Sequence, residues 1–333
     1  MQSRRQPKIP VAGDGANNKK KQTNTDEPGK PREPRMQPDP SRYPDDWTPA
    51  EHLGDGVFAF DTENGRRRVT RDIVGRMILL GTGTSHGVPV IGCACPVCLS
   101  DDPRDRRTRA SAIVGLPQGN LLIDTTPDLR TQLLRESIGL VHAVAYTHGH
   151  ADHLMGLDDL RIFARYLGHD LPIYCTEEVE ERIRRTFDYA FDPVTRAFPA
   201  GGVPRLVFRR IEPDQPIEIL GAQVLPVTLE HGKIRAIGYR IGRVAYCTDA
   251  HNIPPSSMRL LEDLDTLILD ALRFERHLTH FSIDEALEFI AELKPTQAYL
   301  THIAHAVGHA RASADLPKNV DFAHDGLTLP LQS

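Results

Sequence analysis

The feature that most constrains this chain is a run of four potential metal ligands within six residues, His148, His150, Asp152 and His153. The run follows an apolar stretch, residues 143–146, that predicts a buried strand. A tight turn at the intervening glycine can direct the first two histidines to one side, and a helix that starts next would return the last two ligands to the same point. Imidazole and carboxylate together suit divalent zinc, manganese or iron. The run therefore predicts a metal site at the end of a strand.

Further ligand-type residues follow strands that are predicted later in the chain. His231 comes after residues 224–229, Asp249 after residues 244–247, and His302 after residues 298–300. Each repeats the pattern of an apolar strand followed by a ligand-type residue in the next loop. Four residues cannot complete the coordination of two ions, so these three are candidates to complete a two-metal site.

Three cysteines indicate a second, separate metal site. Cys93, Cys95 and Cys98 place three thiols within six residues, and a closed tetrahedral zinc site needs one more ligand. His305 is the strongest candidate, because it follows the predicted ligand His302 by three residues. Free buried thiols or a redox-active loop are the alternatives. The two remaining cysteines fall in or beside predicted strands and are expected to be small buried apolar residues.

Composition narrows the class of partner. The 333 residues carry a net charge of −5, which gives no bulk reason to expect binding to nucleic acid. No apolar run approaches the about 18 residues that a membrane-spanning helix needs. The first residues are basic but include no apolar segment, so we expect no secretory signal and a cytoplasmic protein with reduced cysteines.

The first 50 residues differ from the rest of the chain. They hold 9 of the 26 prolines and a run of three lysines at 19–21. Such a stretch cannot bury enough apolar surface to offset the entropy lost on ordering. We therefore expect residues 1–50 to be a disordered, basic, proline-rich tail, residues 51–75 to be an uncertain lead-in, and residues 76–333 to form one folded domain.

From residue 76 onward, short apolar runs alternate with amphipathic stretches, and they predict about eleven strands and five helices. The predicted helices cover residues 127–138, 158–166, 177–187, 255–262 and 283–293. The best marked helix covers 283–293, where Ser282 and Glu285 form a capping-box pattern. Strands with helices inserted between them favour an α/β (α+β) fold of two mixed sheets with helices on the outside. No repeat of fixed period is present, which excludes a solenoid.

At this point the sequence resembles the metallo-β-lactamase superfamily, whose signature is the H-x-H-x-D-H run. Within it the chain looks most like the PhnP-type phosphoribosyl 1,2-cyclic phosphate phosphodiesterases. The similarity is carried by the stretch LGTGTSHGVP at 80–89, the cysteine run at 93–98, LIDT at 122–125, LDDLR at 157–161, and the pair His302 and His305. It extends over about residues 76–333.

The resemblance implies an αββα sandwich with a dinuclear site at one edge of its two sheets. One ion would take His148, His150 and His231. The other would take Asp152, His153 and His302, and Asp249 would bridge the two. Asp124 would support the ligand loop from behind, and a zinc held by three cysteines and His305 would be structural. The implied cofactors are two catalytic divalent ions, zinc or manganese, and one structural zinc.

Two divalent ions can generate a bridging hydroxide and hold the oxygens of a phosphorus centre. The leaving alkoxide then needs a proton donor. By resemblance His280 is the general acid, and His277 is the second choice. Asp158 and Arg161, just after the signature, could orient ligands or meet the substrate. As neighbours three apart on a helix they could equally form a simple surface pair.

The chain lacks the glycine- and proline-rich arm with which transfer-RNA-processing relatives hold RNA. We therefore expect a dinuclear phosphodiesterase acting on a small cyclic phosphate or phosphodiester. Alternatives are a superfamily hydrolase of thioesters, lactones or lactams, and a protein of the pyrroloquinoline-quinone biosynthesis type. Neither a membrane nor nucleic acid is an expected partner, and a homodimer is compatible with the sequence.

Overall fold

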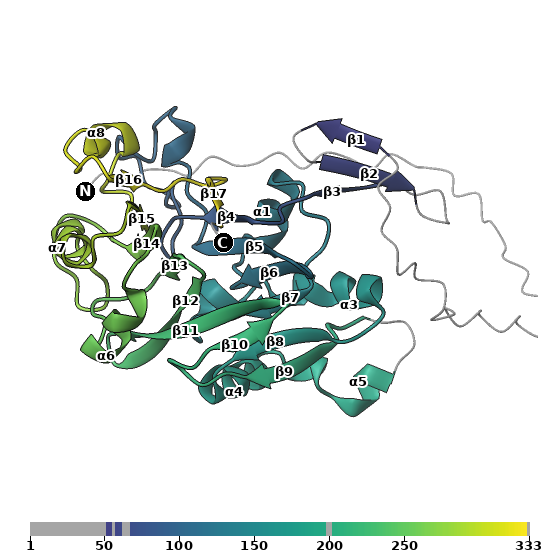
Figure 1. Cartoon of the computed structure of the whole chain (residues 1–333). Coiled ribbons are helices and arrows are strands. Elements are labelled where there is room, and N and C mark those ends of the chain that lie inside the picture. Colours follow the sequence, from purple (N-terminus) through teal and green to yellow (C-terminus); the bar gives the residue numbers. More distant parts are fainter. Residues whose placement is uncertain (1–50, 55–56, 62–66, 198–201, 332–333) are drawn as a thin grey trace, which may run out of the picture. The chain divides into compact units, whose positions relative to one another are not determined.

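Two seven-stranded sheets form the centre of the structure, a computed structural model that describes residues 51–54, 57–61, 67–197 and 202–331 (Figure 1). The predicted tail, residues 1–50, lies outside the described residues. Four strands are almost wholly buried on both faces and are accordingly continuous apolar runs rather than alternating ones: Arg76–Gly81, Ser111–Leu116, Val244–Cys247 and Thr266–Asp270.

The first sheet mixes antiparallel and parallel pairs. Its order across the sheet is β17 (Thr328–Pro330), β4 (Arg76–Gly81), β5 (Ser111–Leu116), β6 (Gly119–Ile123), β7 (Ala143–Ala145), β8 (Leu171–Cys175) and β9 (Leu206–Arg210). The strands from β6 to β9 run parallel, so their carboxyl ends meet at one edge of the sheet.

The second sheet repeats this arrangement. Its order is β10 (Ile217–Ile219), β11 (Ala222–His231), β12 (Ile234–Ile241), β13 (Val244–Cys247), β14 (Thr266–Asp270), β15 (Gln297–Thr301) and β16 (Val320–Phe322). The strands from β13 to β16 are parallel. The strands expected from the sequence are present, whereas β10, β16 and β17 were not expected.

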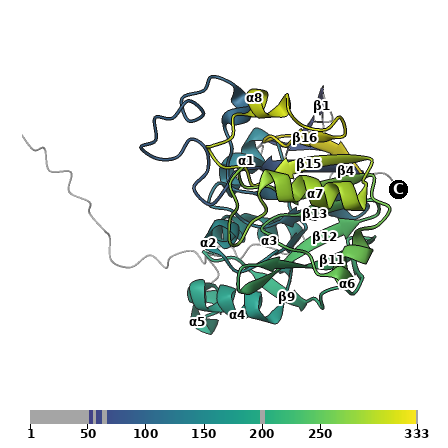
Figure 2. The same cartoon turned by 90° about the vertical axis from the view of Figure 1, so that its left-hand side faces the viewer.

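Helices cover the outer faces of the two sheets. On the first sheet, α1 (Leu129–Arg135) packs on β4, α3 (Arg161–Leu167) on β8 and α4 (Glu177–Thr186) on β9. On the second sheet, α6 (Pro255–Met258) packs on β11, α7 (Ile283–Leu293) on β15 and α8 (His309–Ser313) on β16 (Figure 2). The remaining helices are α2 (Ala151–Leu154) and α5 (Pro193–Ala197). This layering confirms the predicted αββα sandwich.

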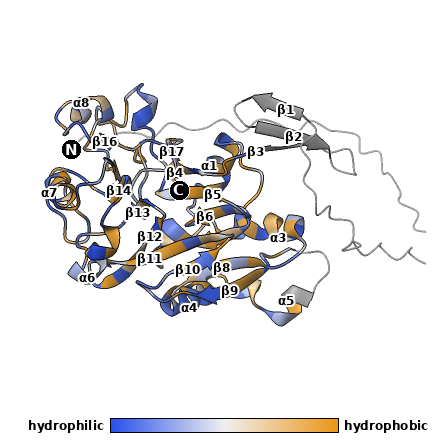
Figure 3. Cartoon of the chain, viewed as in Figure 1, coloured by the Kyte–Doolittle hydropathy of each residue, from blue (hydrophilic) through white to orange (hydrophobic). Residues whose placement is uncertain are grey.

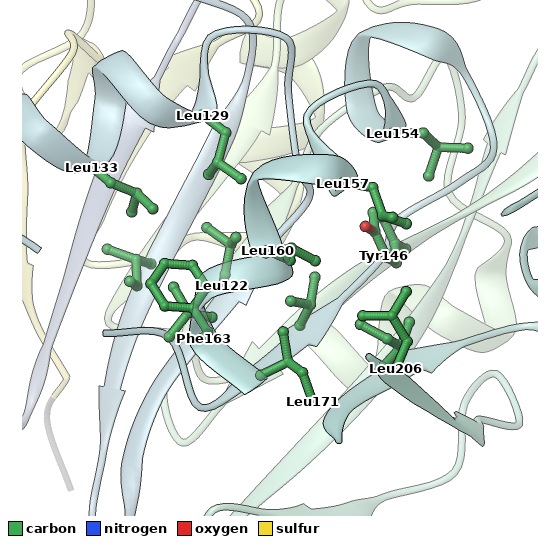
Figure 4. Close-up of a cluster of buried hydrophobic side chains, with 14 of the residues drawn as sticks. Leu122, Leu129, Leu133, Tyr146, Leu154, Leu157, Leu160, Phe163, Leu171 and Leu206 are labelled. Carbon is green, nitrogen blue, oxygen red and sulfur yellow. The ribbon is translucent and has the colours of Figure 1, made fainter. Parts of the chain in front are cut away.

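Apolar side chains fill three layers of core. One lies between the sheets and includes Ile123, Val244 and Ile268. A second lies between the first sheet and its helices, where Leu129, Leu160 and other side chains pack together (Figure 4). The third lies under α7. Figure 3 shows hydrophobic residues along the central strands and hydrophilic ones on α4.

Helix α7 has the bounds that its capping box predicts. The Ser282 side chain accepts a hydrogen bond from the Glu285 backbone amide, and the Glu285 carboxylate accepts one from the Ser282 amide. Other helix boundaries were wrong. The helix expected over 127–138 covers only Leu129–Arg135, because Ser137 turns the chain with φ of 57°. The helix expected over 158–166 is divided into a 3-10 turn, Leu157–Leu160, and α3.

The lead-in contains a separate three-stranded antiparallel sheet of β1 (Glu51–Gly54), β2 (Val57–Asp61) and β3 (Arg67–Arg71). No secondary structure was expected there. Among the described residues, no helix has the length and apolarity required to cross a membrane.

Candidate metal centre

The ligand run begins just after β7 and ends inside α2. His148 and His150 lie in the loop between these elements, and Asp152 and His153 lie in the first turns of the short helix. The other three ligand candidates come from the second sheet. His231 is the last residue of β11, and Asp249 and His302 follow β13 and β15. Strand ends of both sheets thus bring all seven residues to one place.

Three residues of the site have a left-handed backbone that side chains other than glycine rarely adopt. The φ angles are 64° at Asp124, 57° at Asp249 and 60° at His302. Each of these residues follows a strand, so the chain turns sharply as it leaves the sheet. Such a conformation costs on the order of 1–3 kcal/mol and is concentrated at functional sites. The turns aim the side chains at the cluster.

The seven side chains form two groups that meet at one carboxylate. In the first group the ligand atoms of His148, His150 and His231 lie within 4.8 Å of one another. In the second group those of Asp152, His153 and His302 do so as well. Asp249 lies between the groups. Its Oδ1 is 3.5 Å from His302 Nε2 and 4.0 Å from His148 Nε2, and its Oδ2 is 3.3 Å from His153 Nε2.

Hydrogen bonds behind the cluster fix which histidine nitrogen carries the proton. His153 Nδ1 donates to Asp124 Oδ2 over 2.7 Å, and His231 Nδ1 donates to the Thr279 carbonyl over 2.7 Å. The Thr147 hydroxyl donates to Asp124 over 2.8 Å, so that it can accept from His148 Nδ1 at 3.0 Å. In all three histidines Nε2 therefore keeps its lone pair for the cluster, as metal ligation requires.

The donor set fits divalent metal ions. The Nε2 atoms of His148 and His302 are buried and have no hydrogen-bond partner among the described residues. Burial lowers the pKa of both side chains and favours the neutral form that binds a metal. Unpartnered lone pairs that converge on a buried carboxylate would be costly without a cation. The five histidines and two aspartates could hold two ions, one in each group.

Replacement of Asp124 by asparagine should weaken metal binding by about 10- to 100-fold, because the amide cannot act as the same acceptor for both His153 and Thr147. Asparagine tolerates the left-handed backbone, so the fold should be retained. Titration of the metal-free protein with zinc or manganese measures the effect.

Asp214 provides a matched control for this variant. It has φ of 63° and its carboxylate likewise accepts from a backbone amide and a hydroxyl, both of Thr228. The Asp214→Asn variant should lose hydrogen bonds without losing metal affinity. Equal metal affinity in the wild type and the Asp124→Asn variant would show that this carboxylate does not support the ligands.

The cysteine group is closed by the predicted histidine. His305 Nδ1 lies 3.4 Å from Cys93 Sγ, 3.5 Å from Cys95 Sγ and 3.7 Å from Cys98 Sγ. Ligands about 2.3 Å and about 2.0 Å from one tetrahedral centre are roughly 3.5 Å apart. The four side chains are thus spaced as the ligands of one tetrahedral zinc.

A backbone amide favours the thiolate form of Cys95, whereas burial raises the pKa of Cys98 to about 11. The Cys98 amide donates to Cys95 Sγ and lowers the pKa of that thiol to about 6. The loop that carries His305 is also held from the opposite side. The fully buried guanidinium of Arg107 donates to the carbonyls of Ala304 and Val307. Because His302 belongs to the same loop, the cysteine group and Arg107 together stabilise the position of one ligand candidate of the His/Asp cluster.

Replacement of Cys95 by alanine should remove one zinc per chain and lower the Tm by several degrees. A shift of this size follows because about 1 kcal/mol corresponds to roughly 2–4 °C in a domain of about 150–250 residues, and a structural zinc contributes more than that. Elemental analysis and thermal melting measure the two effects. The buried thiol of Cys175 serves as control, since Cys175→Ala should leave the metal content unchanged. Full zinc content in the Cys95→Ala variant would remove this residue from the site.

A pocket of about 350 Å³ opens beside the His/Asp cluster, and His280 forms part of its wall. The His280 ring stacks on that of His302, with centroids 4.6 Å apart. Its Nδ1 donates to Asp270 Oδ2 over 2.6 Å, which leaves Nε2 for the pocket. Burial raises the pKa of Asp270 to about 8 and lowers that of His280. The pair therefore holds a proton within a buried hydrogen bond.

The other sequence candidates lie outside the pocket wall. His277 is exposed, and its ring centroid is 5.3 Å from that of His280. Asp158 and Arg161 form an exposed ion pair with each other, and Asp158 also accepts from the Tyr189 hydroxyl. Sequence reasoning missed Asp270. This residue ends an apolar strand in the same way as the metal ligands do, and that signal could have identified it.

A profile of the beta-lactamase superfamily domain matches residues 119–303, which include every residue of the His/Asp cluster. The chain belongs to the metallo-β-lactamase superfamily. A solved structure described as a new diphosphatase from the PhnP family is 42% identical, with a TM-score of 0.71 over 77% of this chain and 98% of that one. The predicted superfamily and its PhnP-like branch are confirmed.

Other proteins to which this chain is similar have different names. An octanoyltransferase of Porphyromonas gingivalis is 36% identical over 255 residues, 76% of this chain and 51% of that protein. Coenzyme PQQ synthesis protein B of Rhodopseudomonas palustris is 33% identical over 158 residues, 44% of this chain and 47% of that protein. The chain thus spans about half the length of these curated relatives. A zinc-bound PqqB structure from Methylobacterium extorquens, 21% identical with a TM-score of 0.62 over 77% of this chain and 100% of that one, shares the fold.

Proposed function

We propose that this chain is a metal-dependent hydrolase that cleaves a small cyclic phosphate or another phosphodiester. The observation that carries the proposal is the placement of His280, an imidazole on the pocket wall that stacks against a ligand candidate of the seven-residue His/Asp cluster. Hydrolysis of an alkyl phosphodiester requires both a site that activates water and a donor for the leaving alkoxide.

The cluster would hold two divalent ions, zinc or manganese, which supply an activated water and polarise the phosphoryl oxygens when bound. His280 Nε2 donates a proton to the leaving oxygen. Asp270 holds the opposite nitrogen and so orients the ring and stabilises its positive charge while Nε2 is protonated. The Thr279 carbonyl, one residue before His280, accepts the hydrogen bond from His231 Nδ1. This contact keeps the acid close to the ligand.

The similarity to a PhnP-family diphosphatase supports chemistry at phosphorus, because that protein is named for cleavage of a phosphate linkage. The octanoyltransferase and PqqB names are not carried over, since the chain spans only about half of each protein. Hydrolysis of a thioester or lactone is the alternative within the superfamily.

A small substrate panel tests the proposal. The protein is stripped of metal, reloaded with manganese or zinc, and assayed on bis(p-nitrophenyl) phosphate, a ribose 1,2-cyclic phosphate, a diphosphate ester, a thioester and a lactam. We expect turnover of the phosphodiesters that is lost with chelator and restored by metal. Faster turnover of the thioester or lactam than of either phosphodiester would overturn the proposal.

A further inference from the structure

The cysteine group differs from the His/Asp cluster because three of its four ligand candidates can be oxidised. Cys95 and Cys98 are separated by two residues and belong to one tight turn, in which the Leu99 amide donates to the Cys95 carbonyl over 3.1 Å. The Cys98 amide also donates to Cys95 Sγ over 3.4 Å. The ligand atoms of the group, these two sulfurs included, lie within 4.8 Å of one another. Two cysteines at this spacing in a turn are typical of thiols that form a disulfide reversibly.

Solvent exposure distinguishes the two sulfurs of this pair. Cys95 is partly exposed, whereas Cys98 is buried, with 5% of its surface accessible. An oxidant in solution therefore meets Cys95 first, and Cys98 lies behind it as the second thiol. Accessible thiolates beside a second thiol are the cysteines most susceptible to reversible oxidation. Cys175 and Cys247, elsewhere in the fold, are fully buried and lack such access.

One short loop connects the cysteine group to the His/Asp cluster. His305 completes the cysteine group, and His302, three residues earlier, is a ligand candidate of the cluster. His302 has φ of 60°, a strained conformation that persists only where the surrounding structure holds it. Arg107 supports the loop through the carbonyls of Ala304 and Val307, and the contact of His305 with the cysteines supports it from the other side. Loss of the cysteine contact would therefore remove one support of the strained turn.

We propose that Cys95 and Cys98 are an oxidation-sensitive pair that a hydroperoxide joins in a disulfide, so that the cysteine group can no longer hold zinc and the His302 loop loses a support. The pair thereby makes metal binding at the His/Asp cluster dependent on redox conditions. A dithiol reductant reverses the modification. The inference does not depend on which ester the cluster cleaves, and it goes beyond the proposed phosphodiesterase function.

The reaction needs no reactant other than the hydroperoxide and protons. Cys95 Sγ attacks the terminal oxygen of the hydroperoxide, the O–O bond breaks, and the alkoxide takes up a proton and leaves as an alcohol. Cys95 is then a sulfenic acid. Cys98 Sγ attacks Cys95 Sγ, the S–S bond forms, and the hydroxide takes up a second proton and leaves as water. The two sulfurs lose two electrons, and the peroxide gains them.

Hydrogen peroxide tests the proposal on the whole chain with zinc in its cysteine group. Oxidation should release one zinc per chain to a chromogenic chelator and remove two of the five thiols, and dithiothreitol with zinc should restore both. The peptide that contains Cys95 should lose the mass of two hydrogen atoms. Manganese is poorly suited to thiolate ligands, so a manganese titration reports on the His/Asp cluster. Its affinity should fall by about tenfold or more on oxidation, because ligands that lose their supporting contacts bind metal more weakly.

Two histidine variants isolate the pair. Cys93→His and Cys95→His both leave two cysteines and two histidines, a donor set that holds structural zinc. Only the first variant retains both Cys95 and Cys98. Peroxide should still release zinc from the Cys93→His variant, and it should do so at least about tenfold more slowly from the Cys95→His variant, which lacks the accessible thiol. Cys175→Ala removes a buried thiol outside the group and should behave as the wild type.

Three results would overturn the proposal. In the first, peroxide leaves the zinc and the thiols of the wild type unchanged, or oxidises them to a form that dithiothreitol cannot reduce. In the second, both histidine variants release zinc at the same rate. In the third, manganese affinity is unchanged after the disulfide has formed. If a histidine variant does not bind zinc, the thiol count and the peptide mass of the wild type decide. Absence of phosphodiester turnover would overturn the proposed function and leave this inference intact.

Discussion

The Asp249→Ala variant is expected to lose at least about three orders of magnitude in phosphodiester turnover while it remains folded. Asp249 lies between both ligand groups, with Oδ1 4.0 Å from His148 Nε2 in the first group and Oδ2 3.3 Å from His153 Nε2 in the second. Without this carboxylate the two sites no longer share a ligand, and only the carboxylate of Asp152 would remain beside the five histidines to balance the charge of a pair of cations. Metal ions at such a centre contribute several kcal/mol of transition-state stabilisation, which corresponds to a loss of this size.

The backbone at this position requires its own control. Asp249 has φ of 57°, where alanine is strained and asparagine is better tolerated. Asp263 has the same φ of 57° and is exposed, so Asp263→Ala reproduces the strain outside the site. Asp249→Asn tests the charge with nearly the same shape. We expect normal activity in the Asp263 variant and loss of both activity and metal in the two Asp249 variants. Retained activity in Asp249→Asn would exclude a bridging carboxylate.

The sequence located the seven residues of the His/Asp cluster better than it located their surroundings, and the reason is physical. A ligand-type residue of such a site lies where the chain leaves a strand at one edge of a sheet. An apolar run followed by His or Asp is therefore a local signal of the site, as at His231 and His302. Helix α7 was equally predictable because its capping box is contained in four residues. These features depend on neighbours in sequence.

Features that depend on distant packing were missed. Strand β17 exists because its residues pair with β4, about 250 positions earlier, and three residues alone carry no periodicity. Asp270 has the strand-end position of a site residue, but its partner His280 is fixed only when the chain between them folds back over ten residues. None of these contacts produces a residue spacing that can be recognised in the sequence alone.

The His280→Ala variant is expected to distinguish an acid catalyst from a structural neighbour of the metal site. An alkoxide leaving group needs a proton in the transition state, and a positioned acid contributes about 10²- to 10⁴-fold. A p-nitrophenolate leaves without one. We therefore expect a loss of at least about 100-fold on a ribose cyclic phosphate and a distinctly smaller loss on bis(p-nitrophenyl) phosphate.

The exposed His277, on the same loop, is the matched control for this variant, and His277→Ala should retain activity on both substrates. Metal content must be measured beside activity, because ligand-type atoms of His280, His231 and Asp249 lie within 4.8 Å of one another. Metal loss in His280→Ala would make this residue a ligand, and equal losses on both substrates would assign it to binding or charge stabilisation. If His277→Ala alone shows the dependence on the leaving group, the acid is His277, and the buried hydrogen bond from His280 to Asp270 serves to stabilise the wall of the pocket.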